Sequence, residues 1–131
     1  MKKVVITGAS GMIGVALTEE CIAQGCEVLA LVRGGSPNNS RIPQSPLVRV
    51  VECGLEELSS FDYSERGFDA FYHLVWSGTS PEKRKDPAEQ QKNVQYTIDA
   101  VHLAGRLGCK KFIGAGSQAE YGPKDLERIS P

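Results

Sequence analysis

The sequence lacks the features by which several classes of protein are recognised. No apolar run approaches the ~18 residues that a membrane span needs, so we predict no contact with a membrane. Fifteen Lys and Arg residues are balanced by sixteen Asp and Glu residues, and a formal net charge of −1 gives no reason to expect a nucleic-acid partner. The first apolar run, Val4 to Ile6, is too short for the core of a secretory signal.

Cysteine is scarce, and its spacing does not match a metal site. The four cysteines form neither a CxxC pair nor a zinc-binding pattern, so we predict no bound metal. Cys21 and Cys26 flank an expected helix end, and we interpret them as small apolar residues. Unpaired cysteines are ordinary in a reducing compartment, which favours a cytoplasmic location.

The rest of the composition is that of one globular domain. The 131 residues are 40% hydrophobic and 24% charged, which is enough for a single core and predicts one domain over residues 1–131. Five short runs rich in β-branched or apolar residues are expected to be strands: "KKVVITG", "CEVLALVR", "LVRVV", "AFYHLVW" and "KKFIGAGS". Since helical patterns separate them, we predict an α/β fold: a Rossmann-type, three-layer, doubly wound parallel sheet of about five strands in the order 3-2-1-4-5.

Two amphipathic helices are predicted between these strands. In "GMIGVALTEECIAQG", the residues Ile13, Leu17 and Cys21 are expected to share the buried face. In "AEQQKNVQYTIDAVHLAGRLG", the expected buried face consists of Val94, Ile98, Val101 and Ala104.

The remaining connections are shorter or irregular. Residues 34–46 contain three prolines, which we take to exclude a helix and to indicate a long surface loop. The stretch "LEELSSF" leaves room for one short helix.

The first strand-to-helix junction, "TGASGMIG", has the spacing of a dinucleotide-binding loop. Gly8 allows the tight turn after the strand, Gly11 lets a pyrophosphate approach the backbone, and Gly14 lets the helix pack closely on the sheet. The amide groups at the head of the following helix would then receive the phosphate charge. A P-loop is excluded because no GK[ST] follows the glycines.

The end of the second strand, "LALVRGGS", points to the cofactor. NAD-binding sites of this kind usually carry Asp or Glu there to bind the adenosine ribose, whereas this sequence has Arg33 and no acid within reach. A guanidinium group suits a 2′-phosphate, and Arg41 is placed to assist it. The sequence therefore favours NADP over NAD.

Taken in order, "TGASGMIG", "FYHLVW", "NVQYTIDAVHLAGRLGCKKFI" and "GAGSQAEYG" resemble the extended short-chain dehydrogenase/reductase family, and within it the NAD-dependent epimerase/dehydratase branch. This branch acts mostly on nucleotide sugars by hydride transfer. The resemblance covers the whole chain but only the N-terminal, cofactor-binding part of such an enzyme, so we expect a fragment. The resemblance assigns cofactor binding to Thr7, Gly8, Ser10, Gly11, Met12, Ile13, Gly14, Arg33, Leu74, Val75 and Asn93. It makes Ser117 the catalytic hydrogen-bond donor, with Trp76, Gln118 and Tyr121 in a substrate pocket.

The sequence departs from the family pattern in three places. Gly54 stands where the family often has an Asp that contacts adenine, so Glu52 or a backbone group is the candidate substitute. Val75 and Trp76 replace small residues and would narrow the pocket, and Gly116 replaces the Ser or Thr that commonly precedes the position of Ser117.

The tyrosine–lysine pair of the family is not found in these residues. Family catalysis uses a YxxxK helix, but Asp125 stands four residues after Tyr121, and Gly122 follows that tyrosine directly. We therefore expect Tyr121 to be a pocket or packing residue and this chain to be inactive alone. His73 is expected to be a packing residue at a strand end. The alternative function is a non-catalytic NADP-binding redox sensor or regulatory module. Self-association through an exposed sheet edge is a further hypothesis.

Overall fold

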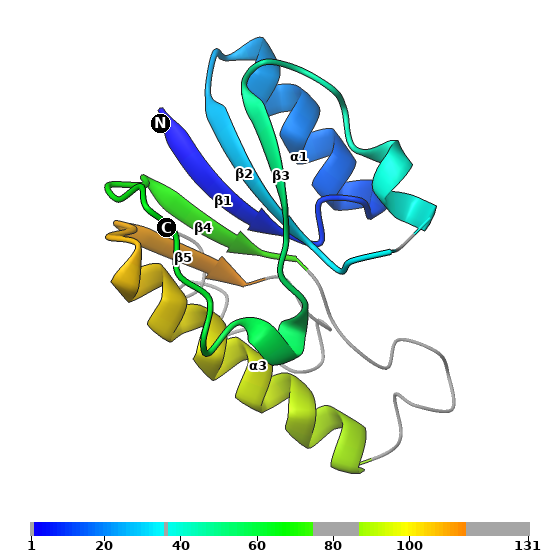
Figure 1. Cartoon of the computed structure of the whole chain (residues 1–131), viewed down its shortest axis with the longest axis vertical. Helices are drawn as coiled ribbons and strands as arrows, with labels where there is room; N and C mark the ends of the chain where they lie inside the picture. Colours follow the sequence, from blue (N-terminus) through cyan, green and yellow to red (C-terminus); the bar gives the residue numbers. More distant parts are fainter. Residues whose placement is uncertain (1, 36, 75–86, 115–131) are drawn as a thin grey trace, which may run out of the picture.

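The computed structural model describes residues 2–35, 37–74 and 87–114, and within them one parallel sheet forms the centre of the molecule (Figure 1). Its five strands are arranged in the order β3-β2-β1-β4-β5, which confirms the predicted topology. The strands are β1 (Lys3–Thr7), β2 (Glu27–Val32), β3 (Val48–Glu52), β4 (Ala70–His73) and β5 (Lys111–Gly114). All four neighbouring pairs are parallel, so the carboxyl ends of the strands meet at one edge.

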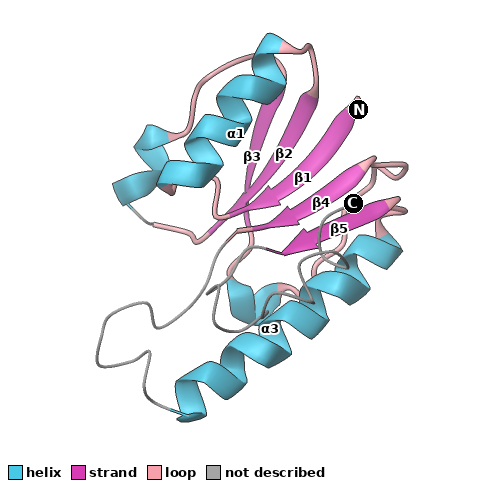
Figure 2. Cartoon of the chain, turned by 180° about the vertical axis from the view of Figure 1, so that it is seen from behind, coloured by secondary structure: helices cyan, strands magenta, loops and turns pink. Residues whose placement is uncertain are grey.

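Helices cover both faces of this sheet (Figure 2), which gives the three layers that the sequence predicts. Helix α1 (Met12–Ala23) packs on one face through Cys21, in a core that includes Val4, Ile6 and Val28. Helix α3 (Pro87–Arg106) packs on the other face, where its buried side chains meet a second core around Phe71. Strands β1 and β2 contribute alternate residues to the two cores, as strands that are buried on both faces must. Within the part of the chain described, no helix is long and apolar enough to cross a membrane.

The buried face of α1 differs from the predicted one at its first turn. Gly14, Thr18 and Cys21 are buried, and Leu17 is partly buried, but Ile13 is 65% exposed. Ile13 lies in the first turn, beyond the carboxyl ends of the strands, where the sheet offers no surface to cover it. Cys21 and Cys26 belong to the apolar core on this face, as predicted.

The buried face of α3 was predicted wrongly in larger part. Of the four predicted residues only Ala104 is buried, while Val94, Ile98 and Val101 are 50%, 42% and 45% exposed. The helix instead buries a stripe rotated around its axis, which consists of Asn93, Ala100, Leu103 and Ala104 and is continued by Leu107 directly after the helix. Both stripes are mainly apolar at helical spacing, and the sheet is covered by the stripe that leads to the two leucines.

The connection between β2 and β3 also differs from its prediction as a loop without a helix. A short 3₁₀ helix, η1, runs from Pro37 to Arg41. Proline is tolerated at the first position of a helix because its missing N–H group has no partner there in any case. Because η1 is so short, the edge strand β3 stays partly uncovered, and Val50 is 49% exposed.

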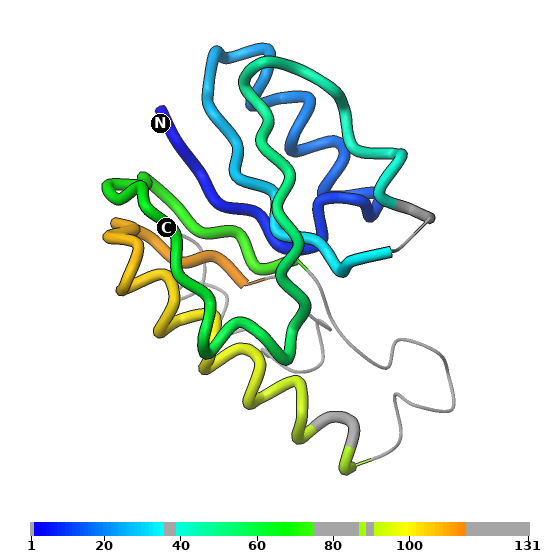
Figure 3. The backbone as a smooth tube through the Cα atoms, viewed as in Figure 1, coloured from blue at the N-terminus to red at the C-terminus, as the bar shows by residue number. Residues whose placement is uncertain are grey.

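The segment after β3 crosses to the opposite face of the sheet and runs beside α3 before it enters β4 (Figure 3). It contains the predicted short helix as a single 3₁₀ turn, η2 (Leu55–Glu57). Leu58 is buried against α3, and the Arg106 guanidinium donates to the carbonyl groups of Leu58 and Phe61 at 2.9 and 3.1 Å. This segment therefore completes the core on the α3 face.

The amino ends of the strands are held together by a charged network. The Asp69 carboxylate accepts the backbone N–H groups of Lys2 and Lys3 at 2.6 and 3.0 Å, and lies 3.7 Å from the Lys110 ammonium group. Glu65 pairs with both Lys3 and Arg49. These contacts tie β1, β3 and β5 to the segment that leads into β4.

Candidate functional site

The loop between β1 and α1 forms the tight turn that its glycines predict. Gly8 has a φ of 74°, a conformation that favours glycine, and its carbonyl oxygen accepts the Gly11 N–H at 3.1 Å. The turn reverses the chain directly at the carboxyl end of β1, so the head of α1 points at the edge where the strands end (Figure 1).

Gly14 and Gly11 are small for different reasons. A Cβ atom on Gly14 would lie 2.2 Å from the Gly8 carbonyl oxygen and 2.7 Å from Cα of Ala9, so the protein's own backbone excludes any side chain there. A Cβ atom on Gly11 would lie 3.5 Å from the same oxygen, which is ordinary contact. The fold itself therefore tolerates a side chain at Gly11, and the absence of one leaves room for a ligand.

The head of α1 is open to an anion. Gly11 is the N-cap residue and offers no side-chain oxygen, and the first turn contains no acidic residue. Met12 and Ile13, the first two helical residues, are 89% and 65% exposed. Backbone N–H groups that no side chain caps, at the positive end of a helix, form an anion-binding site that suits a pyrophosphate.

Thr7 and His73 join the ends of β1 and β4 beside this loop. The Thr7 hydroxyl accepts the Leu74 N–H at 3.1 Å and lies 2.9 Å from Nδ1 of His73. The hydroxyl group and Nδ1 therefore share one hydrogen bond, and the tautomer of the imidazole sets which of the two donates. Burial lowers the pKa of His73 to about 4, so the imidazole is neutral at physiological pH. The ring stacks on Phe112 at 6.2 Å, in keeping with its interpretation as a packing residue.

The junction of β1 and β4 is the point at which the sheet changes direction. From β1 the chain builds outward through β2 to β3, and then returns to add β4 and β5 on the other side. Ligands of open α/β sheets bind at such a switch point, outside the carboxyl ends of the strands. Thr7, the glycine loop and Leu74 all lie there.

The cofactor prediction assumed that no acidic residue lies near the end of β2, and the structure shows that this assumption is wrong. Arg33 follows β2 and is exposed, as expected. An acid does lie within reach, however, because Glu52 pairs in register with Val32 at the end of the neighbouring strand. A Cβ atom built on Gly34 would lie 3.1 Å from both Cδ and Oε1 of Glu52. The predicted strand order could have revealed this acid, because in a 3-2-1 sheet the last residues of the second and third strands are neighbours.

The structure also bears on which group could replace the Asp that contacts adenine in the family. Gly54 donates its backbone N–H to Oε1 of Glu57 at 3.0 Å, in a capping interaction that begins η2. The Gly54 N–H is therefore engaged within the protein and is not the backbone group that could contact adenine.

The remaining predicted residues are distributed as follows. Ser10 is partly buried in the loop, and Leu74 is partly buried after β4. Asn93 is only 1% exposed, within the first half of α3. The predictions for Val75, Trp76, Ser117, Gln118 and Tyr121 lie outside the described residues. Within the described part, no three His, Cys, Asp or Glu side chains gather into a metal site.

Comparison with known proteins agrees with this geometry. Residues 4–130 match the model of the NAD dependent epimerase/dehydratase family. A dTDP-4-dehydro-6-deoxy-D-allose reductase from a Streptomyces species is 29% identical over 99% of this chain, and the match covers 40% of the reductase. The chain thus spans about two fifths of the length of that relative.

Solved structures share the fold at lower sequence identity. A UDP-galactose 4-epimerase superposes with a TM-score of 0.74 at 21% identity, over 94% of this chain and 41% of that chain. The Bordetella bronchiseptica enzyme WbmG, solved in complex with NAD and UDP, superposes with a TM-score of 0.65 at 23% identity, over 85% of this chain and 36% of that chain.

Proposed function

The chain belongs to the NAD dependent epimerase/dehydratase family, and on this basis we propose that it is the dinucleotide-binding part of an enzyme that acts on a nucleotide sugar or a related carbonyl compound by hydride transfer. The observation that carries this proposal is the uncapped head of α1, packed on the turn at Gly8 so closely that Gly14 must lack a side chain. This arrangement presents first-turn amides to a pyrophosphate at the switch point of the sheet.

The names of the relatives support a nucleotide-sugar substrate. One is a reductase of a dTDP-linked deoxyallose, and another is an epimerase of UDP-galactose. Both names describe a reaction on a sugar that carries a nucleoside diphosphate, a reduction in one case and an epimerisation in the other. Whether this enzyme epimerises, dehydrates or reduces depends on residues that hold the sugar, for which Trp76, Gln118 and Tyr121 remain our candidates.

In this proposal, the bound nicotinamide supplies the hydride acceptor or donor. The chain's own residues bind and orient it: the α1 amides hold the pyrophosphate, and the Thr7–His73 pair fixes the ends of β1 and β4 against each other. Ser117 is proposed to donate a hydrogen bond to the substrate oxygen. Arg33, exposed after β2, remains a candidate for contact with the adenosine ribose or with a 2′-phosphate, and the preference for NADP that the sequence predicts rests on this residue.

Replacing Gly11 by Ala tests the binding site with little risk to the fold. The new Cβ atom would meet the Gly8 oxygen only at ordinary contact distance, so we expect the melting temperature to be nearly unchanged. It would occupy the approach of the pyrophosphate, so we expect the Kd for NADH to rise about tenfold or more, equivalent to about 1.4 kcal/mol. Isothermal titration calorimetry on the 131-residue chain measures this change.

Gly105→Ala is the matched control, since this helical glycine has open space around its Cα among the described residues and lies on α3. It should leave the Kd unchanged. If Gly11→Ala binds NADH as tightly as the unmodified chain does, the glycine loop does not receive the pyrophosphate.

A further inference from the structure

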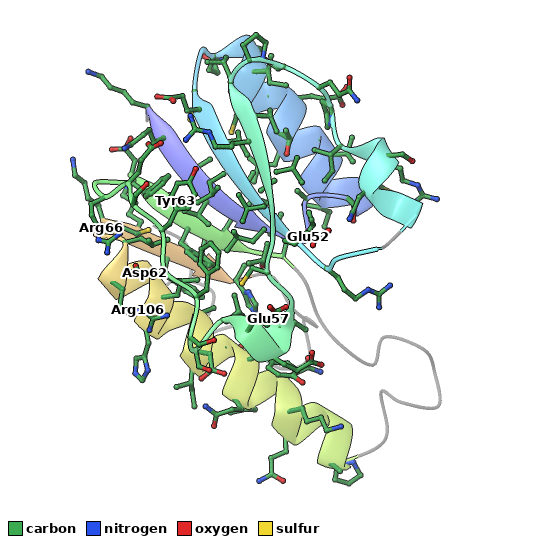
Figure 4. All side chains as sticks on the ribbon, in the orientation of Figure 1. Glu52, Glu57, Asp62, Tyr63, Arg66 and Arg106 are labelled. Atoms are coloured by element: carbon green, nitrogen blue, oxygen red, sulfur yellow. The ribbon has the colours of Figure 1, made fainter. Side chains whose placement is uncertain are left out.

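The Glu52 carboxylate lies beside the end of β2, where sites of this kind usually carry the acid that binds an adenosine ribose, although Glu52 itself belongs to β3. Its strand, β3, pairs with β2 so that Glu52 lies opposite Val32, the last residue of β2. The Cys53 N–H donates to the Val32 carbonyl at 2.8 Å, which holds the two strand ends together. Figure 4 shows Glu52 toward the carboxyl ends of the strands, away from Asp62 and Arg66 near the amino ends.

Gly34 brings the carboxylate close to the chain that follows β2. A side chain on Gly34 would meet Cδ and Oε1 of Glu52 at 3.1 Å and Oε2 at 3.4 Å, which is tighter than ordinary contact. The φ of Gly34 is not among the positive values found at other glycines, so its backbone does not require glycine. The space beside the Glu52 carboxylate is therefore the structural consequence of having glycine at this position.

Glu52 has no evident role in holding the fold together. The residue is exposed, and no hydrogen bond or ion pair joins its carboxylate to another described residue. At the opposite end of the sheet, by contrast, Glu65 and Asp69 are each engaged by several donors. A carboxylate held at a strand end without a partner of its own is available to a ligand.

Even-numbered residues of β3 face the same side of the sheet as α1. Val48 packs in the α1-side core, and side chains alternate along a strand, so the Glu52 side chain leaves β3 on that side. The pyrophosphate-binding head of α1 lies on the same side. A dinucleotide whose pyrophosphate lies on α1 and whose adenosine extends toward β2 would thus bring its ribose to Glu52.

We propose that Glu52 selects the adenosine ribose of the cofactor by accepting hydrogen bonds from its free 2′- and 3′-hydroxyl groups, and that it thereby favours NAD over NADP. A carboxylate accepts two such bonds and repels the dianionic 2′-phosphate of NADP. This inference rests on the proposed function, and it opposes the preference that Arg33 alone predicts. Among the described residues, the two exposed side chains form no ion pair with each other.

The experiment compares the Kd values of NADH and NADPH by calorimetry on the 131-residue chain. We expect the unmodified chain to bind NADH more tightly. In Glu52→Gln, which keeps the shape and removes the charge, we expect the ratio of the two Kd values to shift toward NADPH by roughly tenfold to a hundredfold. In the double variant Glu52→Gln with Arg33→Ala, this gain for NADPH should disappear, because in the single variant the Arg33 guanidinium supplies it.

Glu27→Gln is the matched control. Glu27 is exposed at the amino end of β2, so this variant removes the same charge at the far end of the neighbouring strand. It should leave the ratio unchanged. The melting temperature of Glu52→Gln should equal that of the unmodified chain, since the carboxylate bonds no described residue.

The outcomes separate the two proposals. If the unmodified chain binds neither NADH nor NADPH, the proposed function is wrong. If it binds a dinucleotide but Glu52→Gln leaves the ratio unchanged, the dinucleotide site stands and the assignment of Glu52 is overturned. A clear preference of the unmodified chain for NADPH would also overturn it and would restore Arg33 as the selecting residue.

Discussion

At the amino ends of the strands the charged groups of this domain are paired, whereas at the carboxyl ends they stand beside open backbone. Asp69 and Glu65 each receive at least two donors, from Lys2, Lys3, Arg49 and Lys110. At the other end, the head of α1 has neither a capping side chain nor an acid in its first turn. Glu52 and Arg33 also lie there, and among the described residues they form no ion pair with each other.

This difference indicates that the amino ends of the strands contribute to stability, whereas the carboxyl ends are available for the proposed binding site. Paired charges at the amino ends add local order and need no ligand. At the carboxyl ends, the uncapped amides of α1 and the Glu52 carboxylate are exposed to water, and in our proposal a bound dinucleotide would use them and thereby raise the stability of the fold. The Thr7–His73 pair is the exception at that end, because it is buried, neutral and complete within the protein.

Among the substitutions that test this comparison, Gly14→Ala is expected to have the largest effect on stability and on dinucleotide binding. Its Cβ atom would lie 2.2 Å from the Gly8 carbonyl oxygen, so the helix must move away from the turn. Overpacking of this kind costs about 3 kcal/mol or more, and the displaced amides would lose the dinucleotide as well. Chemical denaturation and NADH titration measure the two losses.

Gly105→Ala serves as the control here too, since alanine in an open helical position should raise the free energy of unfolding by about 0.5–1 kcal/mol. A Gly14→Ala variant with unchanged stability would show that the loop and helix do not pack as described.

The second effect is a dependence of stability on pH that His73 should produce. Burial lowers its pKa to about 4 from the ordinary value of 6.5, so the unfolded chain takes up the proton first as the pH falls. Stability from this residue is complete above pH 6.5, declines between about 6.5 and 4, and changes no further below that. The difference between the two pKa values corresponds to roughly 3 to 4 kcal/mol of unfolding free energy.

His73→Asn tests this dependence, because Asn presents an acceptor near the place of Nδ1 but does not titrate. We expect the free energy of unfolding, measured in urea at pH 7 and pH 5, to fall less in the variant than in the unmodified chain. His102→Asn is the control, since His102 is exposed on α3. An equal fall in His73→Asn and the unmodified chain would mean that His73 does not stay neutral in the folded state.

What the sequence predicted well was local, and what it missed depends on distant neighbours. The turn at Gly8 and the close packing at Gly14 follow from three glycines within one loop. The face of α3 could not be decided locally, because Val94, Ile98 and Val101 repeat at helical spacing just as Ala100, Leu103 and Leu107 do. The neighbourhood of Glu52 and Gly34 required the register of β3 on β2, which no local pattern encodes.

The same distinction applies to the hydrogen bonds at the sheet ends. The sequence shows that Thr7 and His73 each end a strand, but their contact joins residues 66 positions apart. The contact of Asp69 with Lys2 spans 67 positions. Strand order brings both pairs within reach, so the predicted order 3-2-1-4-5 contains the information, although it does not identify which side chains meet.

The smallest effect is expected from Asp69→Asn at the amino ends. The two backbone N–H bonds from Lys2 and Lys3, and then the nearby Lys110, hold the pKa of Asp69 below its ordinary value of 3.8. The carboxylate therefore contributes stability that is complete well above pH 3.8 and is lost as the pH falls through the lowered pKa. Asn keeps an acceptor for the same N–H groups, so the comparison isolates the charge.

We expect Asp69→Asn to be modestly less stable than the unmodified chain at pH 7, with a difference that narrows below pH 4, and to bind NADH with an unchanged Kd. Thermal denaturation across this pH range and one titration at pH 7 measure both quantities. Asp99→Asn is the matched control, since that carboxylate accepts a single side-chain hydrogen bond from Gln95 on the surface of α3. If Asp69→Asn weakened NADH binding, the two ends of the sheet would be coupled, and the separation of stability from binding would not hold.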